Sequence, residues 1–177
     1  MSALARRGIQ PSALRAFWLE LAITQKDISV PLSSLFSHNT KAVDSTAPRL
    51  AFVRDAVRMP ITGAPDEATL VRYPDQPNKD PRRHGLTSGH VWIEKEDASM
   101  GSFRLKDLVD VDRHEDTLIS GGIERQDQRP IVHWTVDASK DATLVLAEDD
   151  QLHEVRGRLE PHDFPAGTVV QLERIGY

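Results

Sequence analysis

The sequence predicts a mainly β protein with an N-terminal helical segment. Near the N-terminus, apolar residues recur at the three- and four-residue spacing of a helix, whereas from Arg49 onward they alternate with charged residues. Several short alternating runs follow, separated by Gly, Pro, Asn and Asp. Short strands divided by turn residues are typical of a β-barrel or a pair of barrels.

A first helix is expected to begin at Pro11. Proline suits the first helical position because its missing N–H has no partner there in any case. Leu14, Phe17, Trp18 and Leu21 then fall at positions i, i+3, i+4 and i+7, which places them on one apolar stripe. The pattern predicts a helix of about three turns that buries this stripe.

A second helix is expected after Ser29, a residue type that caps helix N-termini. Leu32, Leu35 and Phe36 would form its buried face, and it would end near Asn39. The strands expected after this helix are residues 50–59, 68–73, 90–94, 103–111, 130–136, 142–146 and 167–174.

The composition limits the class of protein. Zero cysteines among 177 residues exclude disulfides, thiolate metal sites and cysteine nucleophiles. No apolar run approaches the roughly 18 residues of a membrane span, and the first ten residues lack the features of a secretion signal. A soluble, cytoplasmic protein with no membrane partner is therefore expected.

The charge is unevenly distributed along the chain. Residues 1–83 carry 12 Lys and Arg against 8 Asp and Glu, whereas residues 84–177 carry 10 against 19. The first part is therefore basic although the whole chain has a net charge of −5. Basic faces, more than whole-chain charge, mark nucleic-acid binding, and the acidic second part is typical of a solubilising surface.

Signatures of catalytic chemistry are absent from the sequence. It contains no GxxxxGK[ST] or GxGxxG phosphate loop, no GxSxG elbow and no HExxH helix. His84, His90 and His133 leave open a small metal-dependent β-barrel enzyme, although they lack ligand spacing on one strand face. Metal analysis would separate that alternative from a binding module.

Several ordered segments carry a resemblance to a known family. The first are an arginine-rich turn, a helix opening on Pro and Ala-Leu, an N-x-K-x-x-D step and an A-P-R before the first expected strand: Arg6, Arg7 and Gly8; Pro11, Ala13 and Leu14; Asn39, Lys41 and Asp44; and Ala47, Pro48 and Arg49. The later ones are "YPDQPNKD", "SGHVWIEKED", "FRLKDLVDV", "PIVHWTVDA" and "GTVVQLERIGY". In this order they resemble the region after the catalytic core of archaeal- and eukaryotic-type class I glutamyl- and glutaminyl-tRNA synthetases.

The resemblance implies an architecture and a function. Residues 1–46 would form a helical subdomain that contacts the tRNA stem, and residues 47–177 an anticodon-binding region of two linked β-barrels of the ribosomal-protein type. The proximal barrel would comprise about 47–98 plus 137–177, and the distal barrel about 99–136. The chain would be the anticodon-binding portion of a glutamate-tRNA ligase, which attaches glutamate to its tRNA using ATP.

The resemblance also implies which residues touch tRNA. Residues expected at the anticodon loop are Arg49, Arg104, Lys106, Gln171 and Arg174, and those expected on the tRNA backbone are Arg6, Arg7, Lys41 and Arg54. Anticodon bases can be splayed out, so amide and guanidinium groups can read their edges. If one strand held both Gln171 and Arg174, three residues apart, they would point to opposite sheet faces unless a bulge re-aimed one.

Departures from the family pattern matter as well. Both ATP-binding signatures of class I synthetases, the "HIGH" and "KMSKS" types, are absent, so this segment alone is expected to be inactive, with no catalytic residue, metal or cofactor of its own. ATP with Mg would belong to the full-length enzyme. A basic insert of glutaminyl enzymes between the "WI" and "RL" segments is missing, which favours the glutamyl interpretation. A glutaminyl-tRNA synthetase stays the alternative, glutamine tRNA an alternative partner, and DNA is not expected as one.

Overall fold

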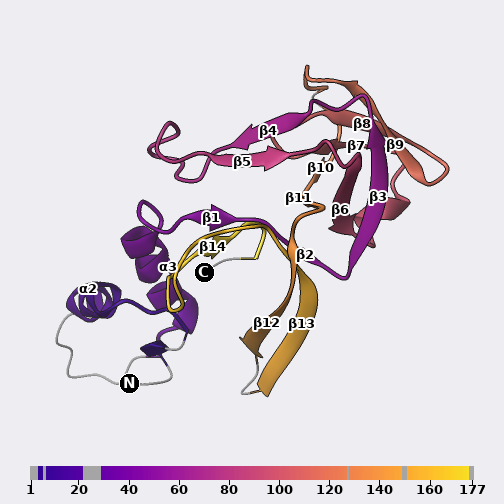
Figure 1. The fold of residues 1–177 in the computed structure, drawn as a ribbon. Helices are drawn as coiled ribbons and strands as arrows, with labels where there is room; N and C mark the ends of the chain where they lie inside the picture. The colour runs from indigo at the N-terminus through magenta and orange to yellow at the C-terminus, as the bar shows by residue number, and fades with distance from the viewer. Residues whose placement is uncertain (1–3, 6, 22–28, 127, 149–150, 176–177) are drawn as a thin grey trace.

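The structure is a computed structural model that describes residues 4–5, 7–21, 29–126, 128–148 and 151–175. Two helices precede a region made almost wholly of strands (Figure 1). Within the described ranges, no helix has both the length and the apolar character needed to cross a membrane. The prediction of a mainly β protein with an N-terminal helical segment is therefore confirmed.

The elements follow one another in this order. The helices are α2 (Pro11–Leu21) and α3 (Leu32–Val43), and a short 3-10 helix, η1, spans Asp97–Ser99. The strands are β1 (Arg49–Leu50), β2 (Phe52–Arg54), β3 (Ala56–Thr62), β4 (Glu67–Leu70), β5 (Arg82–Gly85), β6 (His90–Glu94), β7 (Ser102–Leu105), β8 (Asp110–His114), β9 (Thr117–Gly122), β10 (Ile131–Val132), β11 (Trp134–Val136), β12 (Lys140–Glu148), β13 (Gln151–Leu159) and β14 (Gln171–Leu172).

Helix α2 begins at Pro11, as predicted. Asn39 joins helix α3 to the turn before α2. The backbone N–H of Gln10 donates to the Asn39 side-chain oxygen at 2.8 Å, and the Asn39 amide donates to the Gly8 carbonyl at 3.2 Å. Asn39 is buried, so both polar ends of its side chain have the partners that burial demands. Helix α3 continues to Val43, about one turn beyond the predicted end.

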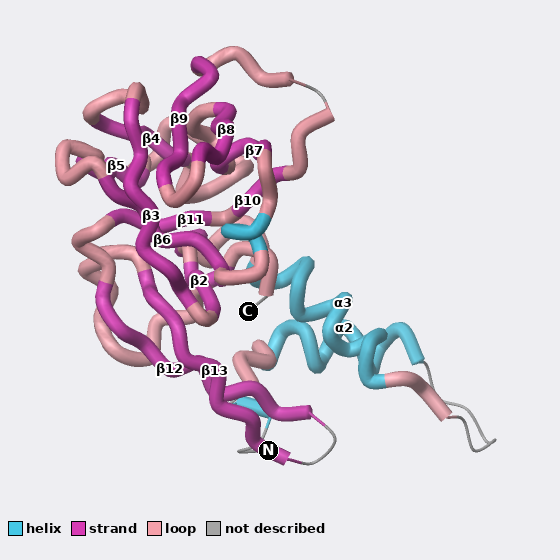
Figure 2. The backbone as a smooth tube through the Cα atoms, turned by 90° about the vertical axis from the view of Figure 1, so that its right-hand side faces the viewer, coloured by secondary structure: helices cyan, strands magenta, loops and turns pink. Residues whose placement is uncertain are grey.

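The predicted apolar stripes are only partly buried. Trp18 is 63% exposed, and Leu32 and Phe36 on α3 are 46% and 43% exposed. Ala13 is the buried residue of α2, whereas Leu35 and Val43 are buried on α3. Helices α2 and α3 lie side by side, away from the strands of the seven-stranded sheet (Figure 2). They bury only the narrow stripe where they face each other, so the rest of each apolar surface stays open.

Most of the apolar core lies within a seven-stranded sheet of order β10-β7-β8-β9-β3-β6-β11. Alternate residues of these strands point inward, such as Val91 and Ile93 on β6 and Phe103 and Leu105 on β7, all fully buried. Strand β3 pairs with β6 on one side and β9 on the other. The division into a proximal and a distal barrel stays a prediction.

Strand boundaries differ from the predicted ones where the chain changes partner. The expected strand 50–59 is divided among β1, β2 and β3, which have different partners. Strand β1 pairs with β14, β2 pairs with β13, and β3 pairs with β6. Asp55, between β2 and β3, has φ +42°. The expected strand 103–111 is the β7–β8 hairpin, with Asp107 at φ +56° in its turn. Turn residues in this left-handed region tolerate Asp better than most side chains.

One strand of the longest ladder was missed, as were β5 and β9. Strands β12 and β13 pair over nine positions, from Lys140↔Leu159 to Glu148↔Gln151. The sequence predicts only residues 142–146 of β12 and no strand at residues 151–159, where β13 lies. Strand β13 was missed because its first four residues are all exposed and its polar and apolar residues do not alternate.

Strand β1 pairs with the late strand β14 in parallel. Arg49 lies opposite Gln171 and Leu50 opposite Leu172, so β1, at the start of the β region, lies beside its last strand (Figure 1). The expected strand 167–174 is reduced to two residues, and Arg174 lies beyond it with φ +71°. The expectation that Gln171 and Arg174 share one strand is therefore wrong, because the chain turns after Leu172.

The close approach of β13 to its neighbour β2 depends on Gly157. A Cβ atom at this position would overlap the Val53 carbonyl oxygen and lie 2.7 Å from Cζ of Phe52. We expect Gly157→Ala to lower the free energy of unfolding by about 1–3 kcal/mol, because backbone and a buried ring must move. Urea denaturation followed by circular dichroism measures the change. Gly85→Ala is the control, since nothing lies within 4 Å of its Cβ; equal stability of both variants would contradict the assignment.

Candidate nucleic-acid interface

Arg49 and Gln171, 122 residues apart in the chain, contact each other directly. Arg49 Nε donates to Gln171 Oε1 at 2.7 Å, across the β1–β14 pair. This contact uses the amide oxygen as an acceptor, so the Nε2 group is the donor end of the Gln171 side chain. The Arg49 side chain is 28% exposed, and one of its Nη groups lies 3.7 Å from Asp44. The two side chains together form a small surface of N–H donors.

The backbone holds this donor pair at both ends. The Arg49 N–H donates to the Arg72 carbonyl at 3.0 Å, and the Gln171 N–H donates to the Pro48 carbonyl at 2.9 Å. Both residues therefore sit on strands whose ladder continues into neighbouring segments. These bonds fix the backbone of both residues, and the 2.7 Å contact between the two side chains orders them before any ligand arrives, which lowers the entropy cost of binding.

Glu173, two residues after Gln171 in the chain, is the centre of a buried ionic network. Arg82 is 1% exposed and donates to Glu160 at 2.7 Å and to Glu173 at 2.8 Å. Lys106 Nζ also lies 3.1 Å from Glu173, and His133 Nδ1 lies 3.4 Å from its other oxygen. The predicted anticodon-loop residue Lys106 is thereby linked to the segment that carries Gln171.

Glu160 extends the network to the start of the β region. Its Oε2 accepts a hydrogen bond from the Ala51 N–H at 2.9 Å and lies 3.6 Å from His84 Nε2. Its own N–H donates to the Ala51 carbonyl at 3.0 Å. Strand β5, the residue after β13 and the segment after β14 are thus joined around two buried carboxylates.

The pKa of Glu173 shows how strongly the network favours its charge. Burial raises the pKa of this carboxyl, but the nearby His133, Arg82 and Lys106 lower it more, to about 2 from 4.5. Glu173 is therefore ionised at neutral pH, and its charge compensates those of Arg82 and Lys106.

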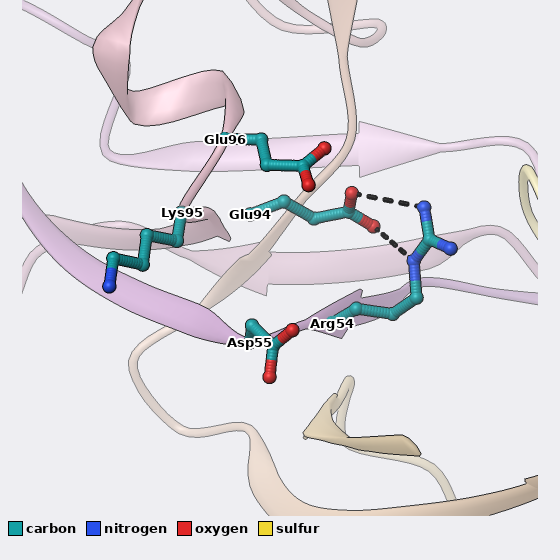
Figure 3. Close-up of a pocket in the computed structure, with 5 residues that line it drawn as sticks. All are labelled: Arg54, Asp55, Glu94, Lys95 and Glu96. Atoms are coloured by element: carbon teal, nitrogen blue, oxygen red, sulfur yellow. Dashed lines mark hydrogen bonds and ion pairs between the residues drawn. The ribbon is translucent and has the colours of Figure 1, made fainter. Parts of the chain in front are cut away.

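A second ionic cluster holds Arg54 and Arg174. Arg54 donates from Nε and Nη2 to the two oxygens of Glu94, at 3.1 and 3.2 Å (Figure 3). These hydrogen bonds and the Glu94 charge raise the pKa of Arg54. Arg174 Nη1 lies 3.0 Å from Asp97 and 3.5 Å from Glu94. The Glu94 carboxylate therefore faces Arg54 and Arg174, two of the arginines that were predicted to contact tRNA.

The surface beside Arg54 is an open depression of about 280 Å³. Arg54 and Lys95 contribute its positive charges, and Asp55, Glu94 and Glu96 its negative ones (Figure 3). Acidic side chains outnumber basic ones here, which does not suit a phosphate group. A backbone contact by Arg54 would need its guanidinium to leave Glu94.

Arg104, on β7, lies apart from both clusters and faces Asp110 of β8. Its Nη1 lies 2.8 Å from Asp110, which is fully buried, and its Nη2 donates to the Ile123 carbonyl at 3.1 Å. The Arg104 side chain is only 12% exposed. The structure therefore gives Arg104 an internal role, and a direct base contact by it stays a prediction that requires the exchange of these partners.

The predicted backbone contacts on the helical segment are more open. Lys41 is exposed in the last turn of α3, and Arg7 is exposed in the turn before α2. Arg6 lies outside the described residues. Among the described residues, His, Asp and Glu form no group of three or more that is placed to hold a metal ion.

Sequence reasoning missed Arg82, Glu160 and Glu173. Arg82 could have been noticed as a charged residue of the "DPRRHG" segment, and Glu173 as the acidic residue between Gln171 and Arg174. Nothing local in the sequence shows that they meet, because 78 and 91 residues separate Arg82 from its two partners.

Comparison with known proteins places this arrangement in a family. Residues 47–127 match the sequence profile described as "tRNA synthetases class I (E and Q), anti-codon binding domain". This part of the chain belongs to that anticodon-binding domain family. The matched residues include β1 to β9, and therefore Arg49, Arg54, Arg104 and Lys106.

Similarity to longer proteins extends over the whole chain. Proteins named glutamate-tRNA ligase from Pyrococcus abyssi and Methanocorpusculum labreanum are 33% and 34% identical to it, over 99% and 100% of the chain. One from Thermoplasma volcanium is 31% identical over 99% of the chain. The chain spans about a third of the length of these relatives: 33%, 32% and 32%. The similarity includes Gln171 and Glu173, which lie beyond the matched anticodon-binding domain residues.

The charge of Glu173 should set part of the acid stability of the protein. Because its pKa is lowered on folding, its stabilisation is complete above pH 4.5 and is lost as the pH falls toward 2. The shift corresponds to about 3 kcal/mol. We expect Glu173→Gln to be less stable at pH 7 by about that amount and to lack this loss between pH 4.5 and 2.

Urea denaturation at a series of pH values between 2 and 7 measures both effects. Glu154→Gln is the matched control, because Glu154 is exposed on β13. A wild-type protein and a Glu173→Gln variant with parallel stability curves across this pH range would contradict the ionic network.

Proposed function

We propose that this chain is the tRNA anticodon-binding portion of a glutamate-tRNA ligase. It positions and reads the tRNA, while activation of glutamate with ATP and Mg takes place in another part of the ligase. The observation that carries the proposal is the donor pair of Arg49 and Gln171 within a chain whose similarity to glutamate-tRNA ligases covers its full length. The site of action of such a ligase is the cytoplasm.

The donor pair fits the edge of an unpaired base. Anticodon bases lack pairing partners, so their carbonyl oxygens and ring nitrogens are available as acceptors. Arg49 and Gln171 offer N–H groups at a fixed relative position, held by the 2.7 Å contact between them. A rigid set of donors discriminates among bases because a mismatched edge leaves buried polar groups without partners.

Other predicted contacts take supporting roles in this proposal. The Lys106 side chain is 28% exposed, but its ammonium group lies 2.7 Å from Asp107 and 3.1 Å from Glu173, so an anticodon-loop contact would compete with these carboxylates. Arg174 and Arg54 share Glu94, so tRNA phosphates would have to compete with that carboxylate. Lys41 and Arg7 on the helical part are the exposed cations that suit the tRNA backbone, where charge positions the RNA without reading it.

Glutamine tRNA is the second candidate ligand. The description of the matched family names both the E and the Q enzymes. The tRNAs of these two enzymes carry anticodons that share their first two bases and differ in the third. The proposal nevertheless names glutamate, because the relatives that match along the whole chain are named for it. Comparison of the two tRNAs with the same protein decides between them.

Substitutions of the donor pair should narrow the preference for the cognate anticodon. We expect Arg49→Ala and Gln171→Ala to reduce the free-energy difference between cognate and anticodon-substituted stem-loops by on the order of 1–3 kcal/mol, as for loss of a base-edge contact. Arg49→Lys should lose nearly as much, since an ammonium keeps the charge but not the planar fork. Fluorescence anisotropy at one salt concentration measures the affinities.

Controls for this experiment use the same residue types elsewhere. Arg58→Ala removes an exposed arginine that binds Asp137, and Gln151→Ala removes an exposed glutamine at the end of the β12–β13 hairpin. Both should leave the preference unchanged. Equal losses of affinity for cognate and substituted stem-loops in the Arg49 and Gln171 variants would show that the pair positions the RNA without reading it.

Lys41 should act on all tRNAs alike. Each cation that neutralises a phosphate releases counterions, so its removal weakens binding and flattens the dependence of log Kd on log salt by about one unit. We expect Lys41→Ala to weaken cognate and anticodon-substituted full-length tRNA equally. Titrations at several salt concentrations test this, with the exposed Lys140→Ala as control. An unchanged salt slope in Lys41→Ala would remove Lys41 from the interface.

A further inference from the structure

A stack of planar side chains lies next to the donor pair, on the loop between β13 and β14. The rings of His162 and Phe164 are stacked, with centroids 5.9 Å apart and planes 19° from parallel. The Arg72 guanidinium carbon lies 5.0 Å from the centroid of the Phe164 ring. Two chain segments about ninety residues apart therefore build one stack of a cation and two rings.

The loop holds its two rings in place without a ligand. His162 Nδ1 accepts a hydrogen bond from the Phe164 N–H at 3.3 Å. The Thr168 hydroxyl and N–H both donate to the Pro165 carbonyl, at 2.8 and 3.2 Å. Pro161 also restricts the backbone of this loop, because the proline ring fixes φ. His162 is exposed and Phe164 is half-buried, so the stack presents a ring to solvent.

Arg72 gives the stack a positive charge that is only partly satisfied. Its Nε donates to the Asp80 carbonyl at 2.9 Å and lies 3.1 Å from the Asp80 carboxylate, which is 68% exposed. The Arg72 side chain is 11% exposed, and its Nη1 is buried with no hydrogen-bond partner among the described residues. Asp163, which lies between the two ring residues in the chain, is exposed.

The position of the stack ties it to the proposed reading site. The Arg72 carbonyl accepts the N–H of Arg49, and the loop with both rings runs directly into Gln171. An RNA loop whose base edge faces Arg49 and Gln171 would carry its neighbouring base past this stack. Aromatic and guanidinium planes are the groups on which proteins stack single-stranded bases.

We propose that His162, Phe164 and Arg72 form a stacking site for the face of one unpaired nucleobase of the anticodon loop, adjacent to the base read by Arg49 and Gln171. This inference rests on the proposed function. Stacking accepts any base because every base has a π face, so the site adds affinity and holds the loop open while the donor pair supplies selectivity.

Abasic substitutions in the RNA test the stacking site. A series of anticodon stem-loops carries one abasic nucleotide at each loop position in turn, and the whole 177-residue chain is titrated with each. With the wild-type protein we expect about tenfold weaker binding when the stacked base is missing. Phe164→Leu and His162→Ala should bind the intact stem-loop about tenfold more weakly and show no further loss at that position. Phe164→Tyr, which keeps the ring, should behave as wild type.

Each outcome separates this inference from the proposed function. Phe36→Leu, at an exposed phenylalanine of α3, is the matched control and should retain the abasic penalty. A Phe164→Leu protein that keeps the same penalty at every position, or loses affinity without removing any penalty, overturns the stacking site alone. A wild-type chain that binds no stem-loop overturns the proposed function as well. Thermal melting confirms folding, and His162→Ala removes an exposed ring, so it remains informative if Phe164→Leu is destabilised.

Discussion

The charges of Arg82, Glu160 and Glu173 are the constraint on which the proposed interface depends. A guanidinium that is 1% exposed is tolerable only with both carboxylates present, since removal of one partner leaves an uncompensated buried charge. Each partner comes from a different segment, so the network fixes β5, the end of β13 and the segment after β14 against one another. The positions of Gln171 and Lys106 depend on this ionic network. The geometry of the Arg49 and Gln171 pair therefore depends on buried ion pairs.

Local patterns in the sequence predicted the elements whose cause is local. Pro11 opens α2 as expected, and the alternating residues 90–94 form β6. The errors arise where tertiary pairing decides, as at Asp55, where the chain leaves one partner strand and joins another. Strand β13 was missed because residues 151–154 are exposed on a strand whose apolar and polar residues do not alternate. Trp18 lies on the predicted apolar stripe but is exposed. A helical period shows which face is apolar, but not whether another element covers that face.

The candidate site was predictable as a set of residues but not as a geometry. Resemblance to a family named Arg49 and Gln171 separately, whereas their direct contact follows from a parallel pairing that no local pattern shows. Arg104 and Arg174 share the chemistry of Arg49, yet their guanidinium groups face internal carboxylates. A basic residue type therefore indicates what a side chain can bind, and only the fold shows which partner it already has. Glu173 could be noticed beside Gln171, but nothing local in the sequence shows that it is buried against Arg82, because buried ion pairs join segments of any separation.

The parallel pairing of β1 with β14 also imposes an order on folding. Arg49 leaves the ribosome more than a hundred residues before Gln171, so β1 must wait with an unpaired edge while the intervening strands form. Glu160 can bind Arg82 early, but Glu173 arrives last and completes the charge balance. Arg49 thus meets its amide partner long after β1 itself has been made. A chain cut short before Gln171 would leave the edge of β1 unpaired and Arg49 without that partner.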